Sequence, residues 1–403
     1  MQKLAGCVYI RTYRYGRKMR KKFTSSISVL SALFLIISIV CSGCGGGTTP
    51  EGDTNPSTSP NNDSQHEPVV QRLSDLVATD ATLRGELEDA LKTQDESSPW
   101  HDRTLEDMFD FFDEWLVFLP MPDNARKYMD EFYEFAGSGK GREVVAKEPF
   151  SGWLYEFMIA RGQFMDSAES AAVLPSWLSD SEVNIGDYVV PPNGYGSFNE
   201  FFTRRIKPGV RPIDAPGNAS VLTAPADSTI LSLAGELTSD TTLEVKGDTL
   251  NIRELLGGDE RADEFLNGKA ILCMLATTNY HRFHSPVQGK IVAEHQLGGL
   301  YYGMTGGWVE YFFQHRRGYY IFETEEFGHV GMVCVGMFTI SSISFVTSEG
   351  DIVEKGDELG NFAYGGSAII LLFEPNRVTF SIPIDKGPVH VLMGQGIGSS
   401  IDE

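Results

Sequence analysis

The feature that most constrains the fold of this chain is a change in hydrophobic period near residue 190. Before that point, apolar residues recur at helical spacing, as in Leu83, Leu87 and Leu91. After it come short apolar runs separated by Gly, Asn, Asp and Pro, which is typical of strands and turns. The sequence therefore predicts an α+β protein, with an N-terminal helical domain at 67–189 followed by a β-rich domain at 190–403.

Within the helical half, the pattern predicts helices over 72–91, 104–119, 125–136 and 151–165. Thr104 and Asp107 have the spacing of a capping box at a helix start, and Pro120 stops the same helix. The aromatic stripe that follows Asp107 is interpreted as core. A surface that leans on lipid or on a partner is the alternative interpretation.

Within the β-rich half, one short helix is expected at 198–205 and another at 252–256. Apolar runs bounded by turn residues predict the strands. These expected strands are 229–234, 270–276, 290–295, 318–323, 330–335, 339–346, 369–373 and 378–382.

The first 44 residues differ from the rest, because they contain eight Lys or Arg and no acidic residue. A basic run leads into an apolar stretch at 27–41, which is short for a membrane span and typical of a signal peptide. Together with Cys44 this resembles a bacterial lipoprotein signal, so acylation at Cys44 is expected, with the start at Met1 or Met19 left open. A flexible linker follows at 45–66. We therefore expect a membrane-anchored, exported bacterial lipoprotein. An uncleaved membrane anchor is the alternative, and in both cases the body is tethered to a membrane and exported.

Charge excludes one class of partner. The chain carries a formal net charge of −22, and all of the acidic residues follow the basic leader. Such an acidic body repels nucleic acid, so no nucleic-acid partner is expected. Cys273 and Cys334 lie in apolar strand-like runs, where buried thiols are the simplest interpretation and a disulfide between them stays open.

Three places in the β-rich half could carry chemistry: Asp227 in a proline turn, His281 with His284, and Ser367 after Gly366. Each also has an ordinary interpretation, as a turn-capping carboxylate, structurally satisfied histidines and a tight chain reversal. The two histidines and Asp227 are residue types that bind first-row metals. No HExxH or CxxC pattern lies near them in the sequence, so no metal is expected.

Five segments, in this order, together resemble the phosphatidylserine decarboxylase family over about residues 195–385. They are FNEFFTRRIKPGVRPID at 198–214, APAD at 224–227, Lys246-Gly with LLGG at 255–258, NYHRFHSPVQGKI at 279–291 and EKGDELGNFAYGGSAIILLF at 354–373. Five segments in order are far more specific than any one alone. The helical half resembles a subset of that family with an added N-terminal domain.

The resemblance implies a proenzyme that cleaves itself between Gly366 and Ser367, giving a β chain that ends at 366 and an α chain at 367–403. It implies that Ser367 becomes a covalent pyruvoyl cofactor, which captures the substrate amine as a Schiff base before CO₂ is lost. A serine nucleophile needs a base, and the resemblance assigns this role to His284, oriented by Asp227. It assigns the return of a proton to the product carbon to His281.

The resemblance implies phosphatidylserine as a substrate, with phosphatidylethanolamine and CO₂ as products. The expected membrane tether through the lipid anchor favours this lipid, because it raises the local lipid concentration. A free aromatic amino acid such as tryptophan is the alternative substrate. A third hypothesis is that the protein is not an enzyme but an inactive lipid-binding or scaffold lipoprotein. A homodimer is left open. The chain departs from the family pattern with Ser228, Asn279, Gly365 and Ala368. These departures leave Asp227, His281, His284 and Ser367 in place and loosen the substrate assignment.

Overall fold

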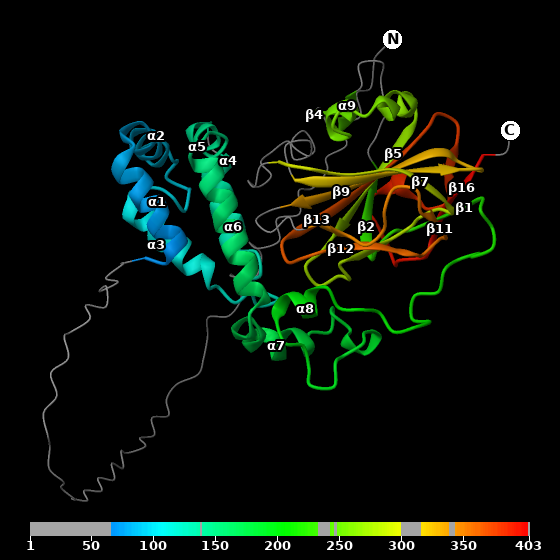
Figure 1. Ribbon diagram of the computed structural model, residues 1–403, viewed down its shortest axis with the longest axis horizontal. Coiled ribbons are helices and arrows are strands. Elements are labelled where there is room, and N and C mark those ends of the chain that lie inside the picture. Colours follow the sequence, from blue (N-terminus) through cyan, green and yellow to red (C-terminus); the bar gives the residue numbers. More distant parts are fainter. Residues whose placement is uncertain are drawn as a thin grey trace, which may run out of the picture. The chain divides into compact units, whose positions relative to one another are not determined.

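The structure is a computed structural model, and it describes residues 66–137, 139–232, 242–245, 248–299, 316–337 and 343–401. The expected signal at 1–44, including Cys44, and all but the last residue of the expected linker lie outside the described residues. The described part combines helices and antiparallel sheets, which confirms the predicted α+β class (Figure 1).

The N-terminal half is helical, as predicted. Asp80 begins the second helix by accepting hydrogen bonds from the amides of Thr82 and Leu83. The capping box of Thr104 and Asp107 is present at the start of the third helix. The helices are α1 (Pro68–Thr79), α2 (Ala81–Lys92), α3 (Leu105–Leu116), α4 (Lys127–Gly137), α5 (Gly139–Val145), α6 (Phe150–Asp166) and α7 (Leu174–Leu178).

An aromatic core holds these helices together, which confirms the core interpretation of the stripe in α3. The ring of Phe112 on α3 contacts Phe132 on α4 and Trp153 and Phe157 on α6 at centroid distances of 4.7–5.6 Å. Burying rings of this size is the main stabilising term in such a bundle. None of the helices in the described part of the chain combines the length and apolar character that a bilayer-spanning helix requires.

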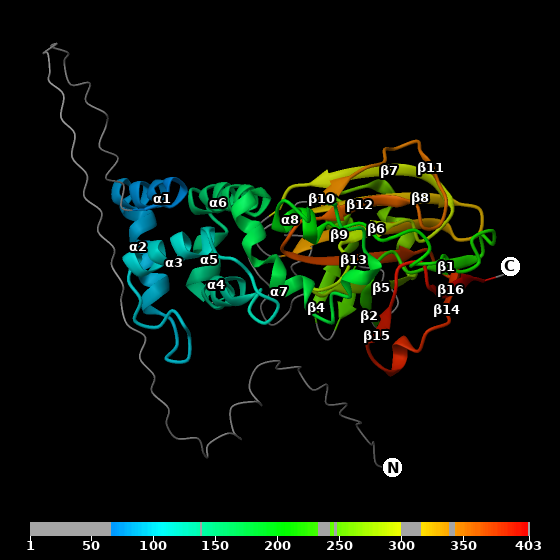
Figure 2. The same ribbon diagram turned by 90° about the horizontal axis from the view of Figure 1, so that it is seen from below.

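The β-rich half is built on one eight-stranded antiparallel sheet, and its order interleaves strands that are distant in sequence (Figure 2). β13 lies inside the sheet, between β9 and β5. The order is β11 (Ile352–Val353), β7 (Gly289–Leu297), β8 (Arg317–Thr324), β9 (Gly328–Met337), β13 (Gly366–Phe373), β5 (Lys269–Leu275), β2 (Ser228–Ser232) and β15 (Val389–Val391).

Three smaller sheets and short helices complete this half. One sheet has the order β1 (Val221–Thr223), β16 (Gly396–Ser400), β14 (Val378–Phe380), and the second has the order β10 (Ile343–Phe345), β12 (Glu358–Phe362), β6 (Arg282–His284). The third pairs β3 (Thr242–Val245) with β4 (Asp248–Asn251). The helices are α8 (Phe198–Phe202) and α9 (Ile252–Leu255).

Both faces of β13 are buried, because successive side chains point to opposite faces of the sheet. Ala368, Ile370 and Leu372 belong to the same hydrophobic core as the buried side chains of the helical half. Ile369 and Leu371 face a second core, which they share with the smaller sheets. Since one apolar core runs from the helices onto the sheet, the described residues of the two halves form one compact unit.

The two buried cysteines are free thiols. Cys273 on β5 and Cys334 on β9 are both register partners of Ile369, one on each side of β13. Two strand spacings separate their backbones by roughly 10 Å, which exceeds the reach of a disulfide. Burial raises the pKa of both thiols, so they stay protonated and act as apolar core groups.

The common core leads to a prediction about cooperativity. Phe198 of α8 is fully buried, and its ring contacts Trp177 of the helical half at 5.3 Å and Tyr364 beside β13 at 5.1 Å. We expect Phe198→Ala to lower the free energy of unfolding by about 3–5 kcal/mol. Tryptophan fluorescence would report the unfolding of the helical half, and amide hydrogen exchange in β13 would report the unfolding of the sheet. Loss of stability in only one of the two halves would contradict a common core.

Candidate active site

Ser367 stands at the start of the central strand β13. Its register partners are Leu275 on β5 and Gly336 on β9, and its exposed fraction is 1%. The peptide bond between Gly366 and Ser367 therefore lies where the chain enters the sheet, with a strand on either side. The serine hydroxyl is withdrawn from water before any chemistry begins.

His281 is the imidazole that reaches this serine. It lies in the loop between β5 and β6, and its Nδ1 is 3.3 Å from Oγ of Ser367. Its Nε2 is 3.0 Å from the carbonyl oxygen of Ala276. A carbonyl can only accept, so Nε2 carries the proton and Nδ1 is the acceptor for the serine hydroxyl.

The surroundings of His281 keep its ring neutral. Burial, together with the charge of Arg204, lowers the pKa of His281 to about 3. Arg204 is itself buried, and its Nη2 donates to the carbonyl oxygens of Thr278 and Asn279 at 2.7 and 3.0 Å. The ring of Phe202 stacks on the imidazole at 3.9 Å. Arg204 thus holds the loop that carries His281 and disfavours a charge on its ring.

His284 is close in sequence but has other partners. Its Nδ1 donates to the carbonyl oxygen of Gly356 at 2.8 Å, and its Nε2 accepts from the hydroxyl of Tyr280 at 2.9 Å. Burial lowers the pKa of His284 as well. Both ring nitrogens are thus engaged away from Ser367. The expected pairing of Ser367 with His284 is not formed in the structure, where His281 takes that place.

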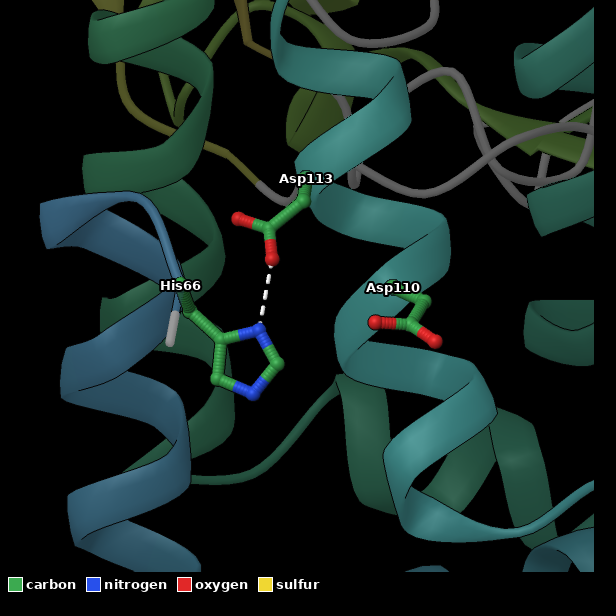
Figure 3. Close-up of side chains that lie close together, drawn as sticks. All are labelled: His66, Asp110 and Asp113. Carbon is green, nitrogen blue, oxygen red and sulfur yellow. Dashed lines mark hydrogen bonds and ion pairs between the residues drawn. The ribbon is translucent and has the colours of Figure 1, made fainter. Parts of the chain in front are cut away.

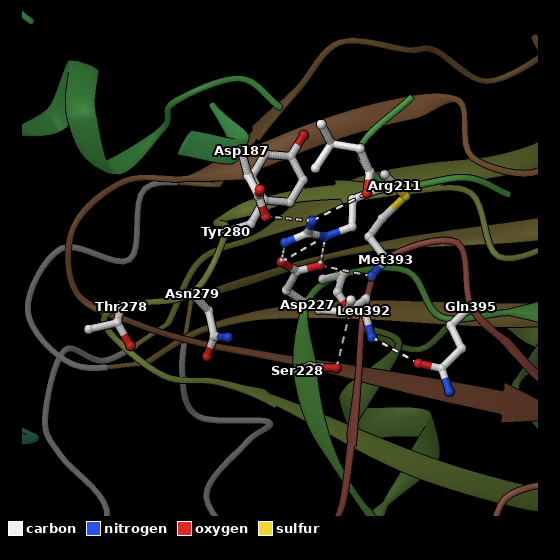
Figure 4. A network of polar contacts seen from close by, with 12 residues as sticks. Asp187, Arg211, Asp227, Ser228, Thr278, Asn279, Tyr280, Leu392, Met393 and Gln395 are labelled. Atoms are coloured by element: carbon white, nitrogen blue, oxygen red, sulfur yellow. Dashed lines mark hydrogen bonds and ion pairs between the residues drawn. The ribbon is translucent and has the colours of Figure 1, made fainter. Parts of the chain in front are cut away.

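Asp227 is held by a cation (Figure 4). Arg211 donates to both of its carboxylate oxygens, the shortest contact being 2.8 Å from Nη2, and the amide of Met393 adds a bond of 2.8 Å. Arg211 also donates to Asp187 at 2.9 Å. A permanent guanidinium fork binds a buried carboxylate more strongly than a neutral imidazole does. This explains why Asp227 does not orient His284 here; the catalytic roles themselves stay predictions.

Sequence reasoning missed Phe202, Arg204 and Arg211 as parts of the site. All three lie in the segment 198–214, which carried the family resemblance but offered no nucleophile or base. Their positions depend on α8 and on the extended chain after it, which bring them against the loop of His281 and against Asp227. The only available signal was the density of arginine and aromatic residues in one short segment.

Two groups of potential metal ligands occur among the described residues, and both lie away from Ser367. One is His66 with Asp110 and Asp113, where Nδ1 of His66 lies 2.6 Å from the Asp113 carboxylate and joins the start of α1 to α3 (Figure 3). The other is Glu264, His329 and Glu374. Neither includes Asp227, His281 or His284, so a shared ion of those three residues has no support in the geometry.

Comparisons with known proteins extend this picture. The model of the phosphatidylserine decarboxylase family matches residues 198–399. Among curated relatives, phosphatidylserine decarboxylase proenzyme 3 of Schizosaccharomyces pombe is 34% identical over 258 residues, which cover 62% of this chain and 27% of the relative. The proenzyme 2 of Oryza sativa subsp. japonica is 36% identical over 227 residues, covering 55% of this chain and 36% of the relative.

A shorter relative is matched almost completely. The phosphatidylserine decarboxylase proenzyme of Fusobacterium nucleatum is 31% identical over 288 residues, covering 69% of this chain and 92% of the relative. The chain thus spans about a third or less of the two eukaryotic relatives and nearly all of the bacterial one. The matched family segment contains Asp227, His281, His284 and Ser367.

The buried, neutral His281 leads to a prediction about pH. In the unfolded chain its pKa is about 6.5, so the unfolded state binds a proton below that pH while the folded state does not. Stability from this residue is complete above pH 6.5 and falls as the pH is lowered toward 3. At pH 5, His281 should therefore cost about 2 kcal/mol relative to pH 7.

Urea unfolding at pH 7 and pH 5 would measure this cost. Wild-type His281 and His281→Gln are compared in a Ser367→Ala chain, so that only one covalent form is present. We expect a smaller loss between the two pH values in His281→Gln. An equal loss in both chains would mean that His281 is protonated in the folded state.

Proposed function

The chain belongs to the phosphatidylserine decarboxylase family, and on that premise we propose that it is a self-processing, pyruvoyl-dependent carboxy-lyase that acts on phosphatidylserine. The observation that carries the proposal is the contact between Nδ1 of His281 and Oγ of Ser367 at 3.3 Å, next to Gly366. Phosphatidylserine is the substrate class in the names of the matched relatives.

Self-cleavage is proposed as an attack of Ser367 on the carbonyl carbon of Gly366. A bond forms between Oγ and that carbon, and the bond from the carbon to the Ser367 nitrogen breaks, which gives an ester. The proton leaves Oγ for Nδ1 of His281 and passes to the departing nitrogen. Since the pKa of His281 is low, the imidazole accepts this proton only in transit.

Glycine at 366 suits this attack, because no side chain hinders the carbonyl and the backbone can adopt the required geometry. Elimination of the ester then removes the proton from Cα of residue 367 and breaks the Cβ–Oγ bond, which releases the Gly366 carboxylate and leaves dehydroalanine at 367. Addition of water to dehydroalanine expels ammonia and gives the pyruvoyl group. The nucleophile, the neutral acceptor and the unhindered carbonyl are all supplied by residues of this chain, so the site fits the formation of that group.

When formed, the pyruvoyl group supplies a carbonyl that captures a primary amine and takes up electrons as the carboxylate leaves. The residues around it are proposed to exclude water and to handle the proton. Phe202 covers one face of His281, and Tyr280 donates to His284. The return of a proton to the product carbon is proposed for His281, whose Nδ1 loses its serine partner on cleavage.

The topology keeps the two proposed fragments together. All of β13 except its first residue, Gly366, lies after the cut, and this part of the strand is hydrogen-bonded to β5 on one side and β9 on the other. β15 and β16, also after the cut, pair with β2 and β1 from before it. The amide of Met393 donates to Asp227, which adds a polar link across the cut. Removing residues 367–403 would open the sheet in its middle, so release requires unfolding.

Mutation of the serine tests self-cleavage. We expect purified wild-type protein to give two chains on a denaturing gel, the smaller of about 4 kDa for residues 367–403. Ser367→Ala removes the nucleophile and should give a single chain. Intact mass should show a pyruvoyl terminus on the small wild-type fragment. A wild-type chain that stays whole with an ordinary serine at 367 would refute the proposal.

A direct comparison of substrates tests lipid specificity. Vesicles containing phosphatidylserine and a solution of free tryptophan are offered to the same preparation, and the release of CO₂ is measured. We expect release from the vesicles alone, with Ser367→Ala as the inactive control. Release only from tryptophan would assign the chain to the amino-acid decarboxylases instead. The tether expected at Cys44 stays a prediction; it would keep the protein at a lipid surface.

A further inference from the structure

The loop before the proposed cut is tied to the helical half of the molecule. This cleavage loop, residues 363–366, leads from the end of β12 to Gly366, the first residue of β13, and Tyr364 lies two residues before Gly366. Tyr364 is 3% exposed, and its hydroxyl donates to the carbonyl oxygen of Ala125, between α3 and α4. Burial raises the pKa of this hydroxyl, so it remains a donor. A contact across 239 residues thus reaches the immediate neighbourhood of the scissile bond.

A second tie runs through the backbone of the same residue. The amide of Tyr364 donates to Oδ1 of Asn199 on α8 at 3.1 Å. Nδ2 of Asn199 in turn donates to the carboxylate of Asp166, at the end of α6, at 2.9 Å. Asn199 is buried whereas Asp166 is exposed. The hydroxyl and the amide of Tyr364 are therefore both connected to the helical half, the first directly and the second through Asn199.

The aromatic contacts of Tyr364 lead to the catalytic histidine. Its ring meets Phe202 edge-on at 5.4 Å, and Phe202 stacks on His281 at 3.9 Å. Phe202 and Asn199 both belong to α8, which is fixed to the helical half because Ser170 accepts from the amide of Phe198 at 2.8 Å. One docked helix therefore supports the loop that carries the scissile bond and the imidazole that accepts the serine proton.

We propose that Tyr364 is a positioning residue for self-cleavage, through which the helical half holds the cleavage loop in place for attack by Ser367. This inference rests on the proposed function and gives the helical half a role in maturation. Ala125, Asn199 and Asp166 complete what we call the Tyr364 clamp. Attack requires Oγ and the Gly366 carbonyl to be held within a fraction of an ångström, and small misplacements lower such rates steeply.

The clamp acts at one stage only. Before the cut, Tyr364 and Ser367 are joined through three peptide bonds, so fixing one limits the other. After the cut, Tyr364 belongs to the large fragment, while residue 367 is held by β5 and β9. Loss of the clamp should therefore slow maturation and leave the turnover of mature molecules unchanged. General destabilisation of the protein would instead lower both the cleavage rate and the turnover of mature molecules.

Tyr364→Phe removes only the hydroxyl and keeps the ring on Phe202. Full-length chains are pulse-labelled in cell-free translation, and the appearance of the small fragment is followed on a gel. We expect cleavage to slow about tenfold, as for the loss of one well-placed hydrogen bond in a reacting geometry. Asp166→Ala, on the exposed end of α6, should slow it roughly threefold through Asn199. Turnover of phosphatidylserine is then measured per pyruvoyl group, counted by reductive trapping of an amine.

Tyr320→Phe is the matched control. Tyr320 is also fully buried, and its hydroxyl also donates to a main-chain carbonyl, that of Leu359, at 3.0 Å. Tyr320→Phe loses the same kind of bond, together with one that the hydroxyl accepts from Thr347 at 3.1 Å, but Tyr320 contacts neither Tyr364 nor Phe202 in the structure. We expect it to lower thermal stability about as much as Tyr364→Phe does while leaving the cleavage rate unchanged.

Slow cleavage with unchanged turnover per pyruvoyl group, in both Tyr364→Phe and Asp166→Ala, would support the clamp. Wild-type cleavage rates in these two variants would overturn it. So would a fall in turnover that matches the fall in cleavage rate, because that indicates general disturbance. If the wild-type chain itself does not cleave, the proposed function is refuted. If the wild-type chain cleaves and the variants cleave at the same rate, only the clamp is refuted.

Discussion

The insertion of β13 between β5 and β9 is the constraint on which the rest of the structure depends. Every residue from Ser367 to Phe373 has a partner on both sides, and both faces of the strand are covered by apolar cores. A strand in this position can be neither exchanged nor exposed without opening the sheet. Ser367, near the start of this strand, is therefore buried in a fixed environment. Because a serine hydroxyl is a weak nucleophile, its reactivity depends on how precisely it is positioned.

The electrostatics follow from that burial. Burial makes an unpaired ionic group costly in this part of the molecule. Asp227 is paired with Arg211, which also binds Asp187. Protonation of His281 is disfavoured, since burial and the charge of Arg204 keep its pKa low. The outcome is an ion pair between Asp227 and Arg211 and a neutral imidazole at His281.

The sequence predicted the large elements well, because each has a clear period or cap. The capping box at Thr104 and the apolar run of β13 are examples, and both lie where they were expected. Short elements were missed, such as α5 and β6. β6 has three residues and contains Arg282 and His284, so nothing in its composition distinguishes it from a loop. It is a strand because β12 lies beside it, which is tertiary information.

The site shows the same limit at the level of single residues. The sequence identified Ser367, His281, His284 and Asp227 as a set, and the resemblance paired the serine with His284. Which imidazole meets the serine depends on ring positions a few ångströms apart, and these are set by groups that no local pattern marks. Tyr280 and Gly356 hold His284, whereas the carbonyl of Ala276 holds His281.

The departures from the family pattern become understandable once their surroundings are known. Ala368 points away from the face of Ser367 into the core shared with the helices, where it is fully buried. A hydroxyl there would need a partner among apolar neighbours, so alanine suits the position. Asn279 accepts the amide of Ala276 at 2.6 Å and so closes the loop that leads to His281.

An acidic residue at 279 could accept the same bond, so the exchange to asparagine preserves the loop while removing a charge. A carboxylate beside Arg204 would reduce the effect of that guanidinium on His281. With asparagine at 279, the charge of Arg204 still lowers the pKa of His281 and favours a neutral acceptor. The two departures therefore adjust the packing and the charge around the serine, and neither removes a group that the proposed cleavage requires.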